Sequence, residues 1–248
     1  MTTATAPASM PLSDHLREAR NRAIRAAIAL VVGVVAGYML SAAILDILRE
    51  PIEALAESRD TSLNYSSITG AFDLKLKIAL TAGIVLSSPV WLYEIFAFIT
   101  PGLHRREKKY VFGFLGAAVP LFALGCATGY SVFPHVVQLL AGFASTEDST
   151  LLSASDYVDF VLKLVLTTGI AYVLPVFIVV LNLLGILSAK ALAHSWRWVV
   201  VAIVLFSAVV TPSSDVLSMF AVALPMTLLF LIALAIAQLH DRRLAKKG

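Results

Sequence analysis

The chain has 248 residues, of which 59% are hydrophobic and 14% are charged, and its formal net charge is +3. Soluble domains usually carry about 25% charged residues, so this composition argues against a soluble globular protein and against a disordered chain. It also argues against a disulfide-stabilised secreted domain, because the single cysteine, Cys126, cannot form an internal disulfide.

Six apolar runs follow one another along the chain. A membrane-spanning helix needs about 20 apolar residues, and backbone groups in hydrocarbon must be hydrogen-bonded within the chain, which favours helices. We therefore expect an all-α membrane protein with six transmembrane helices. The short fifth run and the sixth are separated by a tight turn, so they should be antiparallel neighbours. The runs are 24–45, 74–99, 110–132, 158–184, 196–211 and 216–238.

The connecting segments alternate between rich and poor in lysine and arginine along the chain. They are frequent before the first run, between the second and third, and after the sixth, whereas segment 133–156 has none. Cytoplasmic segments are the ones that carry excess lysine and arginine, so both termini are predicted to be cytoplasmic. The predicted domains are a disordered N-terminal tail (1–12), a six-helix transmembrane domain (13–240) and a basic cytoplasmic C-tail (241–248).

Prolines lie inside four of the six runs. A proline removes one backbone hydrogen bond of a helix and favours a kink, so we expect several kinked helices and a cup-shaped bundle. Glycines four residues apart, which allow close helix approach, occur at Gly33/Gly37 and Gly125/Gly129. The four prolines are Pro89, Pro120, Pro175 and Pro225.

Few charged residues lie inside the runs. Asp73 and Lys77 are four residues apart, as are Asp159 and Lys163, so each pair should neutralise itself on one helix face near the outer end of a span. We interpret Glu94 as a residue at the membrane interface, about two helical turns from the next basic segment.

The first outer loop mixes apolar residues with acids in segment 47–55. This pattern predicts a short amphipathic helix lying on the outer rim, with Pro51 in its first turn.

Common enzyme motifs are absent from the sequence: HExxH, GxSxG and the Gly-Lys dipeptide of phosphate-binding loops have no match. The histidines are scattered, without a metal-binding spacing. We therefore expect a protein that is not an enzyme and that has no metal or other cofactor.

Two segments on the predicted cytoplasmic face each hold one carboxylate among cations. Residues 13–20 contain Glu18, and residues 98–109 contain Glu107. One interpretation is a solvated basic face in which Glu18 pairs with Arg22 at i+4. The other is a pair of carboxylates available to bind guanidinium groups, since a carboxylate and an arginine match as a bidentate fork that lysine cannot reproduce.

At these residues the chain resembles the TatC family, the core subunit of the twin-arginine protein translocase. The resemblance covers about residues 13–244, and its strength lies in the order of the motifs along six runs. The matching residues are His15, Leu16, Glu18 and Arg20 before the first run; Ser87, Pro89, Val90, Phe98 and Pro101 in and after the second; the basic segment 105–109; Phe133 and Pro134; Pro175; and Thr211, Pro212, Asp215 and Ser218.

The resemblance implies a receptor for signal peptides that bear two consecutive arginines, in the cytoplasmic membrane, that starts the export of folded proteins. It places the signal-binding carboxylates at Glu18 and Glu107, and replacing Glu107 should weaken binding far more than replacing Asp241. Residues that shape the same surface are Leu16, Arg20, Phe98 and Pro101. Structural or partner-contact residues are Pro51, Phe72, Pro175 and Asp215.

The same resemblance implies partners and an energy source. The partners are TatA- and TatB-type single-span subunits, the lipid bilayer and further copies of the chain in a larger complex, with no nucleic acid. The driving force is the proton-motive force.

Three positions depart from the family pattern: Val173 and Met219 stand where many members carry Glu and Gln, and Ala19 where Leu is usual. Apolar packing is therefore expected at Val173 in place of a buried polar contact. Two other functions stay open as alternatives, a small-solute membrane transporter and a membrane-protein insertase.

Overall fold

The computed structural model describes residues 12–56, 62–64, 69–99, 108–143, 151–210 and 216–245. It confirms the all-α membrane prediction, apart from two three-residue strands. Four helices are long and apolar enough to cross a membrane, and a bent pair makes a fifth span. The elements are α1 (Leu12–Ala56), β1 (Ser62–Asn64), α2 (Gly70–Leu86), α3 (Ser88–Ile99), α4 (Lys108–Phe143), β2 (Leu151–Ser153), α5 (Ala154–Leu183), α6 (Ala189–His194), α7 (Trp196–Val210) and α8 (Val216–Ala245).

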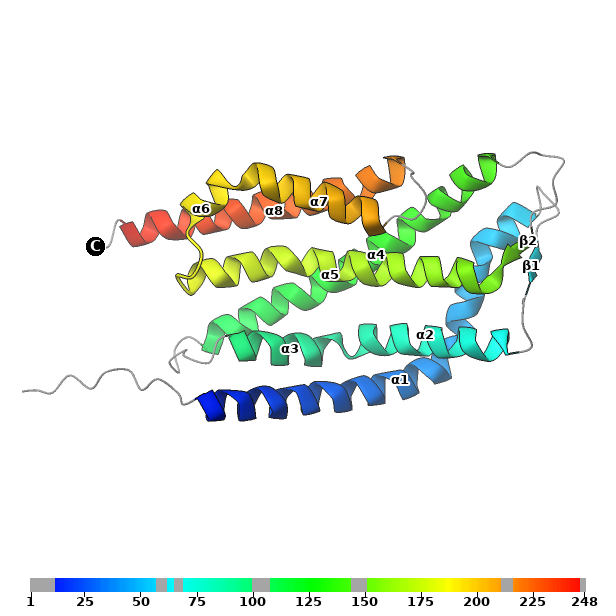
Figure 1. Ribbon diagram of the computed structural model, residues 1–248, viewed down its shortest axis with the longest axis horizontal. Coiled ribbons are helices and arrows are strands. Elements are labelled where there is room, and N and C mark those ends of the chain that lie inside the picture. The colour runs from blue at the N-terminus through cyan, green and yellow to red at the C-terminus, as the bar shows by residue number, and fades with distance from the viewer. Residues whose placement is uncertain are drawn as a thin grey trace, which may run out of the picture.

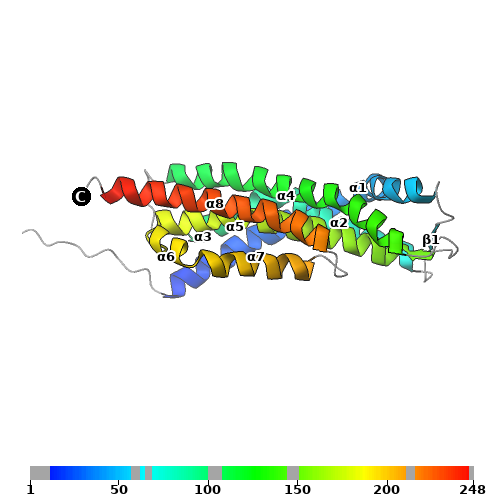
Figure 2. The ribbon, with the colours of Figure 1, turned by 90° about the horizontal axis from the view of Figure 1, so that it is seen from above.

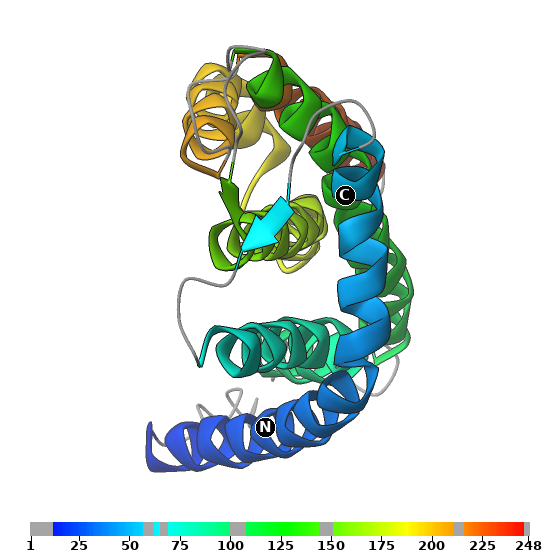
Figure 3. The ribbon, with the colours of Figure 1, turned by 90° about the vertical axis from the view of Figure 1, so that its right-hand side faces the viewer.

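Helices α2, α3, α5, α7, α8 and the first part of α1 run along the long axis of the molecule, whereas α4 crosses them obliquely (Figures 1 and 2). Helix α1 begins and α8 ends at the same end of the molecule, which we call the basic end, and β1 and β2 lie at the opposite, strand end (Figure 1). Viewed from the strand end, the helices follow a curved arc from α1 to α7, with α5 on its inner side (Figure 3). Helix α7 matches the run predicted to be short, and its 15 residues extend about 22 Å.

The second predicted run is two helices, α2 and α3, joined at Ser87 with a bend of 53°. Pro89 lies two residues after the junction and has no N–H to continue the hydrogen bonds of α2. The indole N–H of Trp91 donates to the carbonyl oxygen of Ile84 at 3.0 Å, which satisfies a backbone group exposed by the break. Helices α4, α5 and α8 instead continue through their prolines.

Helix α1 continues without interruption to Ala56 and turns across the strand end in its last third (Figures 1 and 3). The prediction of a separate rim helix starting near Pro51 is therefore wrong. Leu45 and Leu48 are buried, because this part of α1 packs against the start of α5. Segments far apart in the sequence also meet at this end, where β1 pairs in parallel with β2.

The two glycine pairs lie where helices touch. A Cβ on Gly33 of α1 would lie 2.6 Å from the carbonyl oxygen of Gly83 in α2, and one on Gly125 of α4 would lie 2.6 Å from that of Thr168 in α5. Gly129 meets the same face of α5 one turn further on. Glycine thus allows each pair of backbones to approach closely, as the spacing predicts.

The predicted pairing of Asp159 with Lys163 is wrong. Lys77 of α2 lies 3.1 Å from Asp73 on its own helix, as expected, but its Nζ also lies 2.9 Å from Oδ2 of Asp159 on α5. Spacing along one helix identifies neighbours on that helix only, and here the closer cation comes from the adjacent helix. The charges at the strand end therefore join α2 to α5.

Val173 is buried in an apolar cluster formed by α3, α4 and α5, with Phe96 and Phe122 among its members. This confirms the expectation of apolar packing at this position. A carboxylate here would have no polar neighbour in the cluster and would be costly to bury.

Candidate functional site

A cluster of two carboxylates and two arginines lies where α1 packs on α3, near the basic end. Arg22 donates from Nε and Nη2 to a single oxygen of Glu18, Oε1, at 2.9 and 2.6 Å. The local pairing at i+4 is therefore confirmed, and one oxygen of Glu18 is already occupied by Arg22. Neither contact uses the other oxygen, Oε2, and the Glu18 side chain is 26% exposed.

Glu94 is the buried member of this cluster. Its side chain is only 6% exposed; Oε2 lies 3.1 Å from Nη1 of Arg22 and Oε1 lies 3.1 Å from Nη1 of Arg25. Glu94, which the sequence places near the membrane interface, is thus buried between helices and paired with two arginines. Burying an acid inside an apolar span costs free energy unless the acid is paired. The presence of a glutamate within the second apolar run could therefore have identified Glu94 as a paired, buried residue.

The other predicted residues of this end lie around the cluster. Leu16 and Arg20 are exposed on α1, and Leu16 has 64% of its surface accessible. Phe98, near the end of α3, stacks on the ring of His15, with centroids 4.8 Å apart and planes at 21°. Together with the Arg22–Glu94 contact, this stack holds α1 against α3 and places an aromatic surface one turn from Glu18.

The remaining predicted residues are elsewhere or not described. Phe72 is exposed at the start of α2, at the strand end, far from the cluster, and Pro175 is buried inside α5. Pro51 falls within α1, but its side chain is outside the described part. Predictions for Glu107, Pro101 and Asp215 also fall outside the described residues.

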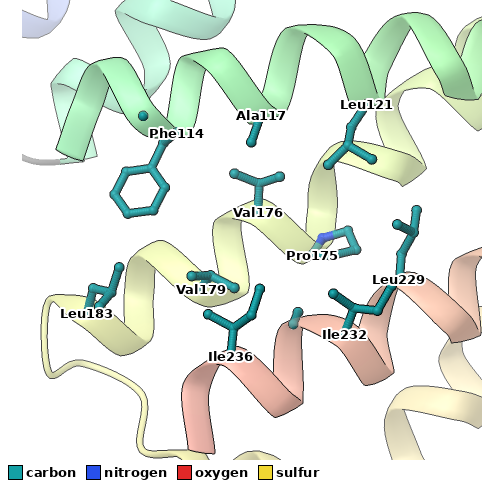
Figure 4. A pocket seen from close by; sticks show the side chains of 12 residues that line it. Phe114, Ala117, Leu121, Pro175, Val176, Val179, Leu183, Leu229, Ile232 and Ile236 are labelled. Carbon is teal, nitrogen blue, oxygen red and sulfur yellow. The ribbon is translucent and has the colours of Figure 1, made fainter. Parts of the chain in front are cut away.

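An apolar hollow of about 400 Å³ lies between α4, α5 and α8 (Figure 4). The labelled side chains of Phe114, Pro175 and Ile232 point into it from the three helices. Its wall has no charged residue, so this hollow cannot recognise a charged motif. In the described part of the chain, no group of three His, Cys, Asp or Glu residues could hold a metal ion.

The fold and the cluster define a class: a multi-pass helical membrane protein with a partly exposed carboxylate among arginines at one end. The comparisons with known proteins narrow this class. The chain matches the family described as "Sec-independent protein translocase protein (TatC)" over residues 14–225.

Curated relatives cover nearly the whole chain. A TatC protein of Xylanimonas cellulosilytica is 43% identical over 94% of this chain and 86% of its own length, and one of Aquifex aeolicus is 33% identical over 94% of this chain and 97% of its own. A crystal structure described as "Twin Arginine Translocase Receptor- TatC" superposes with a TM-score of 0.76 at 32% identity, covering 91% of this chain and 98% of that one.

The chain belongs to the TatC family. It is a core subunit of the Sec-independent, twin-arginine protein translocase, a multi-pass membrane protein and a transport component rather than an enzyme. As a family member it works in a complex with other translocase subunits.

Proposed function

We propose that this subunit is the signal-peptide receptor of the translocase and that it binds the paired arginines of a signal peptide through Glu18 and Glu107. Bound precursors are then exported in the folded state across the cytoplasmic membrane. The basic end faces the cytoplasm, which is where lysine and arginine accumulate in membrane proteins.

The observation that carries this proposal is the state of Glu18. Its side chain is partly exposed, and Arg22 takes only Oε1, so Oε2 is the oxygen that an incoming guanidinium meets. A guanidinium of the signal can donate to both oxygens as a fork, which Arg22 does not do here. The second carboxylate, Glu107, is assigned by the family resemblance.

A basic ligand must approach a basic surface, and the arrangement of the arginines reduces this conflict. Arg22 and Arg25 both turn towards Glu94, which neutralises part of their charge. Exposed Arg17 and Arg20 extend from α1, where lipid phosphates can pair with them. Phe98 is partly exposed and its ring stacks on His15, one turn from Glu18, so the edge of this aromatic pair can contact the hydrophobic stretch that follows the signal arginines.

TatA- and TatB-type single-span subunits and further copies of this chain complete the proposed complex, and the proton-motive force drives transport. The proposed topology, with both termini inside, has a simple check. Single cysteines at Ser13 and Lys190 in a Cys126→Ala background should be labelled only from the cytoplasmic side, and one at Phe72 only from outside; the reverse pattern would exclude the proposed site.

The binding test uses the full chain in lipid nanodiscs and a fluorescent peptide with two consecutive arginines. Glu18→Gln should lower its affinity at least tenfold, because truncating one side of a partly desolvated charge pair costs about 2–5 kcal/mol. A peptide with two lysines in place of the arginines should bind as weakly, since an ammonium cannot form the fork.

The matched control is Asp14→Asn, which removes the same charge one turn earlier on α1, where Asp14 is exposed. It should change affinity less than about threefold. A photo-crosslinker at Phe98 should reach a bound precursor, whereas one at Lys163, at the strand end, should not. Equal binding of the arginine and lysine peptides, or equal effects of the two substitutions, would refute the proposed function.

A further inference from the structure

Arg22 is shared between two carboxylates that lie far apart in the sequence. Nε and Nη2 contact Glu18, four residues earlier, whereas Nη1 contacts Glu94, 72 residues later. The guanidinium therefore has a second partner that does not depend on the first. If Glu18 is taken by another cation, Arg22 still has a carboxylate to pair with.

Glu94 is placed to hold both of its arginine partners. Both of its oxygens are engaged, one by Arg22 and one by Arg25, and the side chain is almost completely buried. Glu18 is the more exposed carboxylate, and its Oε2 receives no donor from Arg22. Of the two acids, Glu18 is thus the one that a ligand can reach, and Glu94 is the one that retains the chain's own arginines.

The charges of the cluster balance: two carboxylates face two guanidinium groups. Because the charges balance, the cluster does not strongly repel a cationic peptide. Because Arg22 is shared with Glu94, it also binds Glu18 less tightly than it would if Glu18 were its only partner. Neutralising Glu94 would change both properties, because two arginines would then face one carboxylate and Glu18 would become the only acid of the cluster left to Arg22.

We propose that Glu94 is a positioning residue for signal binding, which anchors Arg22 so that a guanidinium of the signal peptide can exchange with it on Glu18. This inference rests on the proposed function and adds the residue that makes Glu18 available. In the free protein Arg22 occupies Oε1 of Glu18. In the bound protein Arg22 stays on Glu94, and the signal guanidinium takes both oxygens of Glu18.

The test measures twin-arginine peptide affinity in nanodiscs for a small set of variants. Glu94→Gln keeps the size and removes the charge, and it should weaken binding about tenfold, because Arg22 then closes on Glu18. The double variant Arg22→Gln/Glu94→Gln should restore affinity to within about threefold of the parent, since the competitor is gone. A purely structural role of Glu94 predicts no such rescue.

The matched control is Arg25→Gln/Glu94→Gln. It restores the same net charge as the Arg22 double variant but leaves Arg22 free to occupy Glu18, so it should stay about tenfold weak. If both double variants recover equally, the effect is one of net charge and the exchange mechanism is wrong. If Glu94→Gln fails to insert into the membrane, the single variant Arg22→Gln provides the test. Arg22→Gln should bind the peptide at least as tightly as the parent. A tenfold loss of affinity in Arg22→Gln would overturn the proposal.

The two levels of the hypothesis fail separately. If Glu18→Gln has no effect on binding, the proposed site itself is wrong. If Glu18→Gln weakens binding and Glu94→Gln does not, the receptor assignment stands and only the positioning role of Glu94 is overturned.

Discussion

The hydroxyl of Tyr157, at the start of α5, donates to the backbone carbonyl oxygen of Leu48 in α1 at 2.7 Å. Both residues are buried, and 109 positions separate them in the chain. The ring of Tyr157 also packs edge-on against Phe133 of α4, with centroids 5.2 Å apart. One side chain thus joins three helices at the strand end.

Tyr157→Phe should lower the stability of the protein in detergent by about 1 kcal/mol, because it keeps the ring but removes the hydrogen bond that joins α5 to α1. Thermal unfolding followed by size-exclusion chromatography measures this loss. The control is Tyr130→Phe: Tyr130 also lies beside Phe133 but is only partly buried. A loss as large in the control would argue against the role of the Leu48 hydrogen bond.

Gly125→Ala should destabilise the contact between α4 and α5. The added methyl would lie 2.6 Å from the carbonyl oxygen of Thr168 and 2.8 Å from Cα of Gly169, so the two backbones must separate, at a cost of about 1–3 kcal/mol. Gly116→Ala, on the same helix, meets nothing within 4 Å. This control should leave the unfolding temperature unchanged or slightly raised, and similar losses in both variants would contradict the close-packing account.

Lys77→Gln should loosen the strand end, because it removes the cation that joins α2 to Asp159 of α5. Both side chains are about one-third exposed, so a loss of about 1–2 kcal/mol is expected, between the values for exposed and buried pairs. Lys163→Gln, an exposed lysine on α5 itself, should cost less than about 0.5 kcal/mol. A double-mutant cycle with Asp159→Asn should show coupling for Lys77 and none for Lys163.

Asp241 is predicted to stabilise the fold. Replacing it is therefore an unsuitable control for the effect of replacing Glu107 on signal binding. Its Oδ2 accepts from the backbone N–H of Ala189 at 2.8 Å and its Oδ1 from the amide of Asn182 at 3.1 Å, so α8 is tied to α6 and to the end of α5. Asp241→Ala should cost about 1–3 kcal/mol and speed tryptic cleavage after Lys190. Arg243→Gln, exposed on the same helix, should change neither.

Much of the membrane architecture could be predicted from the sequence, because hydrophobicity and chain length are local properties. The six apolar runs correspond to helices, the short run is α7, and the glycine pairs lie at helix contacts. Motif order was sufficient to predict the TatC family, which the comparisons confirm. The break at Ser87 could not be located from the sequence. Pro89 is the only signal near it, and the three similar prolines lie inside continuous helices.

Pairing between helices was decided by the tertiary structure alone. The sequence by itself determined that Glu18 has Arg22 at i+4, but not that Glu94 takes the other side of the same guanidinium. It placed Asp159 near Lys163, whereas the fold brings Lys77 closer. The physical reason is that a buried or partly buried charge is paired by whichever opposite charge the packing of helices brings within about 4 Å, and no spacing along one chain segment contains that information.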